Sequence, residues 1–220
     1  MRRPDGDPAG VPRVSHKVVL ASHNPGKLVE LRRIFEPHVR GVVVLGLDDV
    51  GVSDEPAETE PTFEGNALIK ARAARDATQL PSLADDSGIC VDALNGMPGV
   101  LSARWSGPAK DNAANNALLL AQLDEVPDER RGAQFRCVVA LCLPDGREFV
   151  QEGVMPGRVL RTEQGSGGFG YDPVFAADGY DRDGAGNDVS TAELTSADKD
   201  AISHRGKALR AIAPVVAEHL

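Results

Sequence analysis

The chain has 220 residues, of which 41% are hydrophobic, and it carries a formal net charge of −9. These values are ordinary for a globular protein with one large domain or two closely packed lobes. No apolar run reaches the roughly 18 residues that a membrane helix requires, and no basic surplus is available to neutralise nucleic-acid phosphates. We therefore expect neither a membrane nor a nucleic acid as partner, although a local cluster of Lys and Arg can still hold a small phosphorylated ligand.

The ends and the cysteines indicate how the chain is organised. Residues 1–16 are rich in Pro, Gly and charge and contain no apolar stretch, which predicts a disordered extension and not a secretory signal. Residues 17–220 are then expected to form the functional domain. Three cysteines, without a CxxC motif, each lie in an apolar stretch (Cys90, Cys137 and Cys142). This pattern favours buried, reduced thiols in a cytoplasmic protein over a disulfide or a zinc site.

The first half of the chain predicts strands alternating with helices. Leu28, Leu31 and Phe35 recur at helical spacing after Asn24, a good N-cap that is followed by proline. The predicted elements are a strand at 17–22, a helix at 25–36, a strand at 42–45, an acidic loop at 48–60, a helix that Thr62 caps and that runs to about residue 78, and short strands at 83–85 and 89–94 on either side of a turn.

The second half predicts turns, a hairpin and a final helix. Pro144-Asp145-Gly146 between two apolar runs is a hairpin signal. The predicted elements are turns at 95–110, a helix at 111–123, paired strands at 134–143 and 148–155, a strand at 159–161, a glycine-rich segment at 165–171, a loop at 178–190, and a helix from about 203 with Ser203 as its candidate N-cap. This order is typical of an α/β protein with a mixed sheet.

The first candidate for chemistry lies between the first strand and the first helix. A helix N-terminus offers free N–H groups and a partial positive charge, which suits a phosphate. Lys27 adds a cation where the helix dipole does not favour one, so an anionic ligand would explain it. The alternative is an ordinary capped helix with a solvated lysine. The residues of this candidate phosphate site are Ser22, His23, Asn24, Pro25, Gly26 and Lys27.

The second candidate is the acidic loop with the helix that follows it. Hard cations prefer carboxylate oxygens, so one of Glu55, Glu58 and Glu60 could bind magnesium. On the helix, Asn66 and Lys70 share a face, from which Lys70 could reach a phosphate. The alternative is a solvated acidic loop and an exposed lysine.

The third candidate is the run Asp85-Asp86-Ser87-Gly88. Adjacent residues of an extended chain point to opposite sides, so one aspartate could bind metal or activate water while the other supports the backbone. Gly88 would let the chain turn without a Cβ clash. Magnesium bridging phosphates, with a carboxylate that takes a proton from water, is the chemistry of metal-assisted hydrolysis. The alternative is a turn in which both aspartates accept backbone N–H bonds.

Two further segments could bind a base. In the glycine-rich segment, Phe169 or Tyr171 could stack on a flat ligand and Asp172 could bond its edge. At the start of the last helix, His204 and Arg205 offer donors that suit a purine with a 6-oxo group, whereas an adenine would leave them unpaired. The alternatives are a glycine loop with its aromatics in the core and a basic surface turn.

The sequence contains no Ser-His-Asp or Cys-His arrangement and no HExxH motif. Attack by a metal-activated water is therefore favoured over a protein nucleophile.

Taken together, the motifs resemble one family. SHNPGK, TFEGNALIKAR, LADDSGICVDALNGMPGVLSARWSG, GGFGYDPVF and AISHRGKAL, in this order, are similar to the noncanonical purine NTP pyrophosphatases, also called the inosine triphosphate pyrophosphatase or HAM1 family. The resemblance runs from about residue 17 to the C-terminus. It implies an elongated α/β subunit whose long mixed sheet and flanking helices form two lobes around a central cleft, as in ITPase and Maf-like proteins.

The resemblance also implies an activity and its residues. The reaction is hydrolysis of ITP, dITP or XTP to the monophosphate and pyrophosphate with Mg²⁺, by a homodimer that cleanses the nucleotide pool. By motif, residues 22–27 and Lys70 bind phosphates, Glu58 and Asp86 bind metal, Asp86 accepts the proton, and Ser87 touches substrate. The base and sugar are held by Phe169, Gly170, Tyr171, Asp172, Lys199, His204 and Arg205.

Two segments depart from the family pattern, and two other functions stay open. The N-terminal extension has no recognised counterpart in the family, and segment 178–190 is longer than usual. Because this segment follows the base-binding loop, its length bears on the movement of a lid and on rates, but not on the reaction class. A Maf-type pyrophosphatase would prefer other bases. A regulatory module would bind a nucleotide without hydrolysing it. The two aspartates disfavour this alternative, because a pure binder gains nothing from carboxylates beside a triphosphate unless metal and water are used.

Overall fold

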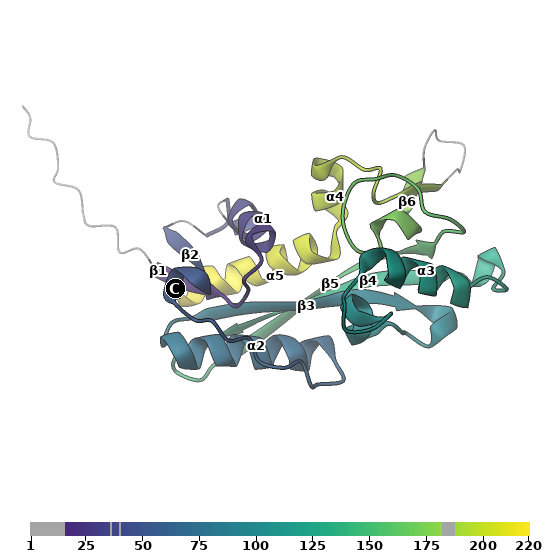
Figure 1. Cartoon of the computed structure of the whole chain (residues 1–220). Coiled ribbons are helices and arrows are strands. Elements are labelled where there is room, and N and C mark those ends of the chain that lie inside the picture. The colour runs from purple at the N-terminus through teal and green to yellow at the C-terminus, as the bar shows by residue number, and fades with distance from the viewer. Residues whose placement is uncertain (1–15, 36, 40, 182–187) are drawn as a thin grey trace, which may run out of the picture.

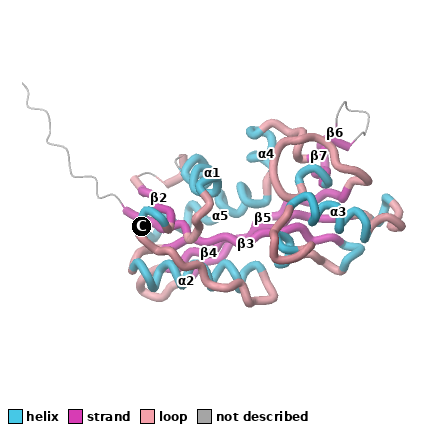
Figure 2. The backbone as a smooth tube through the Cα atoms, viewed as in Figure 1, coloured by secondary structure: helices cyan, strands magenta, loops and turns pink. Residues whose placement is uncertain are grey.

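The computed structural model describes residues 16–35, 37–39, 41–181 and 188–220. The predicted N-terminal extension therefore lies outside the described residues, except for His16, which begins the first strand. A seven-stranded mixed sheet with the order β2-β1-β3-β4-β5-β6-β7 runs along the length of the molecule, with helices on both faces (Figures 1 and 2). The predicted fold class, an α/β protein with a long mixed sheet and flanking helices, is confirmed.

The sheet is parallel at one end and antiparallel over the rest. β1 pairs in parallel with β2 and β3, and every later neighbour is antiparallel. The strands are β1 (His16–Leu20), β2 (Val42–Gly46), β3 (Ser82–Val91), β4 (Gly132–Cys142), β5 (Glu148–Val159), β6 (Phe175–Asp181) and β7 (Asp188–Ser190). The long hairpin of β4 and β5 confirms the prediction made from the Pro144-Asp145-Gly146 turn.

Five α-helices are found in the described part of the chain: α1 (Pro25–Phe35), α2 (Phe63–Thr78), α3 (Asn112–Gln122), α4 (Ser196–Ile202) and α5 (His204–His219). The predicted N-caps are confirmed where side chains show them. The Thr62 side chain accepts from the Gly65 N–H at the start of α2, and the Ser203 side chain accepts from the Gly206 N–H at the start of α5. None of these helices is long and apolar enough to cross a membrane.

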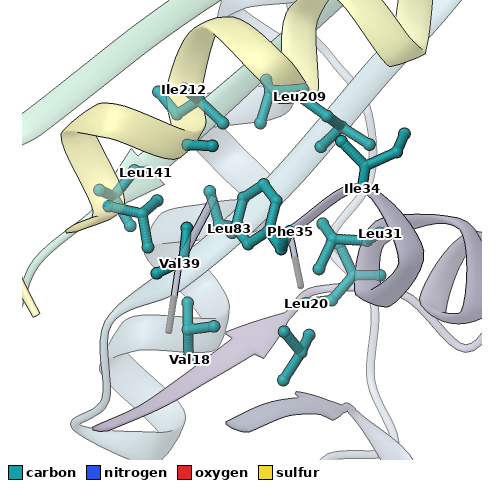
Figure 3. Packing of buried hydrophobic residues seen from close by; sticks show 14 of the residues in the cluster. Val18, Leu20, Leu31, Ile34, Phe35, Val39, Leu83, Leu141, Leu209 and Ile212 are labelled. Atoms are coloured by element: carbon teal, nitrogen blue, oxygen red, sulfur yellow. The ribbon is translucent and has the colours of Figure 1, made fainter. Parts of the chain in front are cut away.

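Buried side chains form a core on each face of the sheet. α1 and α5 lie on one face and α2 on the other (Figure 1). Between the sheet and the first pair, Leu20, Leu31 and Ile212 belong to one cluster (Figure 3). Along β3, Leu83 joins this cluster, whereas Ala84 joins the cluster beneath α2. This alternation sets the directions of the next two side chains.

The predicted turn at the acidic pair is wrong. β3 is one continuous strand, and all of its residues from Ser82 to Val91 pair with β4. Asp, Ser and Gly are turn formers in isolation, but cross-strand pairing over ten positions outweighs that local preference. Gly88 serves a different purpose from the one predicted, because a Cβ there would clash with Ser102 and with the Gly99 carbonyl. It lets the 3₁₀ helix η3 (Gly99–Arg104) pack closely on β3.

Three other expectations also need correction. The strand predicted at 159–161 is not separate, since β5 continues to Val159. The segment 178–190 is not wholly a loop, since β6 extends to Asp181 and β7 begins at Asp188, while 182–187 lie outside the described residues. The short helix α4 was not predicted.

Candidate active site

The site lies on an edge of β3. β1 pairs with β3 only at Ser82 and Leu83, and farther along, η3 covers the strand where the Ile89 N–H donates to the Ser102 hydroxyl. Between these two contacts, Asp86, Ser87 and Gly88 border a cavity of about 280 Å³. A wider cavity of about 750 Å³ between α1 and α4 adjoins it, and the two share Lys27, Phe169, Lys199, His204 and Arg205.

Asp85 faces α1 and α5 and is paired with cations. The Nζ atom of Lys27 lies 2.8 Å and 2.9 Å from its two oxygens, and the Nε atom of Arg205 lies 3.3 Å from Oδ2. Burial opposes ionisation of Asp85, but these two cations outweigh it and hold the pKa of the carboxyl well below its usual range. Asp85 is thus a buried carboxylate that fixes two cations at the cleft.

Asp86 points the other way, toward α2. Its Oδ2 accepts from Asn66 Nδ2 at 3.1 Å, and its Oδ1 lies 3.6 Å from Lys70 Nζ. Burial raises the pKa of Asp86, and the nearby Lys70 charge offsets this only in part. The predicted division of the aspartates between opposite sides is confirmed. A carboxylate in a cleft with a raised pKa is a candidate proton acceptor.

Glu58 lies opposite Asp86 across the Lys70 ammonium. Lys70 Nζ is 2.9 Å from Glu58 Oε1, and Arg104 Nη1 is 3.2 Å from Oε2. Burial disfavours the charged form of Glu58, but Lys70 and Arg104 together lower its pKa below the ordinary value. Of the three glutamates in the acidic loop, Glu58 is the one that borders the cavity.

The start of α1 is a capped N-terminus beside the wider cavity. Asn24 Oδ1 accepts from the N–H groups of Gly26 at 2.8 Å and Lys27 at 3.3 Å. The His23 ring bonds Asp48, and the Ser22 hydroxyl accepts from the Asn24 N–H. Residues 24–27 line the wider cavity, whereas Ser22 and His23 line neither one. Lys27 is the residue of this motif whose side chain reaches Asp85 on β3.

The glycine-rich segment places one aromatic ring in the open and one in the core. Phe169 is 64% exposed, and Lys199 Nζ lies 4.8 Å from the centroid of its ring. Tyr171 is buried and donates its hydroxyl to the Ser102 carbonyl at 2.7 Å. Asp172 is also buried and accepts from the Phe169 N–H at 2.7 Å and from Lys199. Phe169 is thus the ring that is available to stack on a ligand.

The start of α5 contributes two buried side chains. His204 stacks on Phe135 with ring centroids 5.0 Å apart, and burial lowers its pKa to about 3. Its Nδ1 atom is buried without a hydrogen-bond partner among the described residues. Arg205 bonds Glu30 at 3.2 Å and the Ser87 hydroxyl at 3.3 Å in addition to Asp85. The unpartnered nitrogen marks a place where a ligand could bond.

The structure gathers most of the predicted residues around the two cavities and adds three that sequence reasoning missed. Glu30 lies three residues after Lys27 on α1, so the two side chains share one face of the helix. This spacing could have suggested that Glu30 faces the cleft as well. Arg104 and Lys110 line the narrower cavity from η3 and the loop after it. That segment has no apolar period, so no pattern in the sequence indicated which of its side chains face the cleft.

The family model described as the Ham1 family matches residues 18–215. The chain belongs to the Ham1 family. A curated member named dITP/XTP pyrophosphatase from Nocardia farcinica is 58% identical over 202 residues, which cover 91% of this chain and 95% of that protein. The dITP/XTP pyrophosphatase of Cutibacterium acnes is 52% identical, over 93% of this chain and 98% of that protein.

Solved structures of Ham1 proteins share the fold. The nucleoside-triphosphatase described as a dITP/XTP pyrophosphatase from Mycobacterium abscessus superposes with a TM-score of 0.74 at 53% identity, over 90% of this chain and 99% of that one. The Ham1 protein of Staphylococcus aureus superposes with a TM-score of 0.82 at 35% identity, over 93% of this chain and 100% of that one. The resemblance noted from the motifs is therefore confirmed at the level of family and fold.

Proposed function

We propose that this Ham1 protein hydrolyses noncanonical purine nucleoside triphosphates, namely ITP, dITP and XTP, to the monophosphate and pyrophosphate. The names of its relatives support the substrate class. The observation that carries the proposal is the cleft itself. In it, a buried carboxylate with a raised pKa, Asp86, lies 3.6 Å from a lysine, opposite a second carboxylate, Glu58.

The triphosphate would lie among cations from several elements. Lys27 from α1, Lys70 from α2 and Arg205 from α5 border the narrower cavity together with Asp86 and Ser87. A charged phosphate in such a cavity forms charge-assisted hydrogen bonds, which are about twice as strong as neutral ones. The acidic balance of the whole chain is no obstacle, because several cations gather at this one cavity.

The carboxylates fit magnesium. Glu58 and Asp86 supply the hard oxygen ligands that this ion prefers. They are a pair, since no group of three or more His, Cys, Asp or Glu suited to a metal occurs in the described part of the chain. Magnesium is usually held by one or two carboxylates plus substrate phosphates and water, so the pair is sufficient. Bound there, Mg²⁺ would neutralise charge on the phosphates and promote ionisation of water.

Asp86 is the proposed proton acceptor. Asn66 donates to its Oδ2, and the Ser87 N–H donates to its Oδ1 at 3.1 Å, so the side chain is held in one orientation. A raised pKa brings a carboxylate closer to the operating pH, where it removes a proton from water more effectively. Asp85 keeps Lys27 and Arg205 in place from the other side of the strand.

The base would lie at the end of the cleft formed by Phe169 and α5. The exposed Phe169 ring offers a stacking surface. His204 has an unpartnered Nδ1, and its lowered pKa keeps the ring neutral near pH 7. In the tautomer protonated at Nδ1 it would donate to a 6-oxo group, whereas an adenine amino group would meet a donor.

We also propose that the protein is a homodimer and acts in the cytoplasm. The dimer is the assembly that the motif resemblance implies, and light scattering in solution measures it directly. All three cysteines are free and buried, which suits a reducing compartment.

A turnover panel tests the proposed function. Purified protein is assayed with ITP, dITP, XTP, GTP, ATP, UTP and dTTP, with magnesium and with a chelator. We expect turnover of the first three with magnesium only. A preference for ATP, GTP or pyrimidine nucleotides would favour a Maf-type activity, and binding of ITP without turnover would favour a regulatory module.

A further inference from the structure

Both oxygens of the Glu58 carboxylate are bonded to cations within the protein. Lys70 donates to Oε1 at 2.9 Å, and Arg104 donates to Oε2 at 3.2 Å. The Lys70 side chain is only 11% exposed, so this is not a loose surface pair. Because each oxygen already has a positively charged partner, a metal ion that binds Glu58 competes with two cations.

Lys70 is shared with the second carboxylate. Its Nζ atom lies 3.6 Å from Asp86 Oδ1 as well as 2.9 Å from Glu58 Oε1. The two groups proposed to hold magnesium are thus already bridged by a cation of the chain itself. A divalent ion at these carboxylates is favoured only if Lys70 and Arg104 gain other anionic partners.

Nucleotide phosphates are partners of that kind, and Arg104 can reach them. Arg104 lines the same cavity as Lys27, Asp86 and Ser87, and its side chain is 32% exposed. A guanidinium binds phosphate oxygens through paired N–H donors as readily as it binds a carboxylate. We propose that Arg104 is a further phosphate-binding residue, and that on substrate binding Arg104 and Lys70 exchange Glu58 for phosphates and so free Glu58 for the metal.

The inference rests on the proposed function, and it has a signature of its own. If Arg104 restrains Glu58, its removal should strengthen metal binding in the absence of nucleotide. If Arg104 also binds phosphate, its removal should weaken nucleotide binding in the absence of metal. A residue that only supports the fold would weaken both affinities, so the opposite signs are the test.

The experiment measures the two affinities separately for Arg104→Gln. Mn²⁺ is titrated into nucleotide-free protein and followed by electron paramagnetic resonance as a probe for Mg²⁺. Inosine 5′-triphosphate with a methylene group between the α and β phosphates is titrated calorimetrically with chelator present. We expect Mn²⁺ to bind about three- to tenfold more tightly, and the nucleotide to bind weaker by a similar factor, than in the wild-type protein.

Two control variants separate contact from general charge. Lys110→Gln removes a cation that lines the same cavity, and Lys110 forms no ion pair with Glu58 or Asp86 in the described structure. Arg72→Gln removes an arginine on α2 that pairs with Glu148 outside the cleft. Both should leave Mn²⁺ affinity within about twofold of wild type. Arg104→Lys keeps the positive charge but loses the paired N–H donors, so its nucleotide affinity should lie between those of wild type and Arg104→Gln.

The outcomes are distinguishable from failure of the proposed function. Unchanged or weaker Mn²⁺ binding by a folded Arg104→Gln variant overturns the inference, even where the wild-type protein hydrolyses ITP with magnesium. Tighter Mn²⁺ binding by Lys110→Gln of equal size also overturns it, because the effect would then be one of net charge. A wild-type protein without magnesium-dependent turnover counts against the proposed function instead.

Discussion

The Nζ atom of Lys27 lies 2.8 Å and 2.9 Å from the two oxygens of Asp85, which joins the first turn of α1 to the centre of β3. Arg205 reaches the same carboxylate from α5 at 3.3 Å. Three elements that are distant in sequence therefore meet at one buried anion, on the face of the strand opposite Asp86. This arrangement separates a residue that positions cations from the residue proposed to act on water.

Asp85→Asn should destabilise the fold. The change leaves two cations beside a neutral amide, and breaking a buried ion pair in this way costs about 3 kcal/mol of unfolding free energy. Urea denaturation measures the loss. The control is Asp145→Asn at the hairpin turn, where an exposed aspartate pairs with Arg147, and a loss within about 1 kcal/mol is expected there. Equal losses in the two variants would contradict the role of Asp85.

The stability contributed by Asp85 should depend on pH in one direction. Its pKa in the folded protein is below that in the unfolded chain, so its contribution is complete above about pH 5 and is lost progressively as the pH falls below that value. The difference in unfolding free energy between wild type and Asp85→Asn should therefore narrow between about pH 5 and pH 3. A difference in unfolding free energy that widens as the pH falls would contradict a lowered pKa of Asp85 in the folded protein.

Gly88→Ala should disturb the packing of η3 on β3. A Cβ at this position clashes with Ser102 and with the Gly99 carbonyl, which is backbone and cannot rotate away. Overpacking of this kind costs about 1–3 kcal/mol of unfolding free energy. Because Asp86 and Ser87 precede the glycine, turnover should fall as well. An unchanged thermal midpoint together with unchanged turnover would contradict this prediction, because η3 would then shift away from β3 without loss of unfolding free energy.

Phe169→Ala and Tyr171→Phe should separate ligand stacking from support of the fold. Phe169 is exposed, so its loss should leave stability nearly unchanged and raise KM for ITP about tenfold, the usual size of base stacking. Tyr171→Phe removes the hydrogen bond to Ser102, so stability should fall by about 1 kcal/mol with a smaller change in KM. Steady-state kinetics measures KM and thermal unfolding measures stability. A larger change in KM for Tyr171→Phe, with a larger loss of stability for Phe169→Ala, would contradict the assignment of stacking to Phe169.

The sequence was a good guide wherever a local pattern agrees with the tertiary contacts. Thr62 and Ser203 are strong caps, so α2 and α5 were placed within a residue or two. The acidic pair was a poor guide to local structure, because turn-forming residues were read without knowledge of β4, which pairs with the whole of β3. Its side-chain directions were nonetheless predictable, since alternation holds for any extended chain.

Other parts of the site depend on contacts that no local pattern encodes. Arg104 lies in a 3₁₀ segment without periodicity, and its orientation is set by the close packing of η3 on β3. Tyr171 and Phe169 are two residues apart and equally aromatic, but only the structure shows that the Tyr171 hydroxyl bonds Ser102 while Phe169 stays exposed. The engagement of Asp85 by Lys27 and Arg205 likewise joins positions up to 120 residues apart.

The central claim is that Asp86 in this cleft activates water for release of pyrophosphate from a purine triphosphate. The most direct test follows the products of ITP with magnesium by phosphorus NMR, for the wild-type protein and for Asp86→Asn. We expect inosine monophosphate and pyrophosphate as the first products, and turnover that is lower by about 10²–10⁴-fold in a variant that stays folded. Release of single phosphates from ITP, or near-normal turnover by Asp86→Asn, would contradict the account.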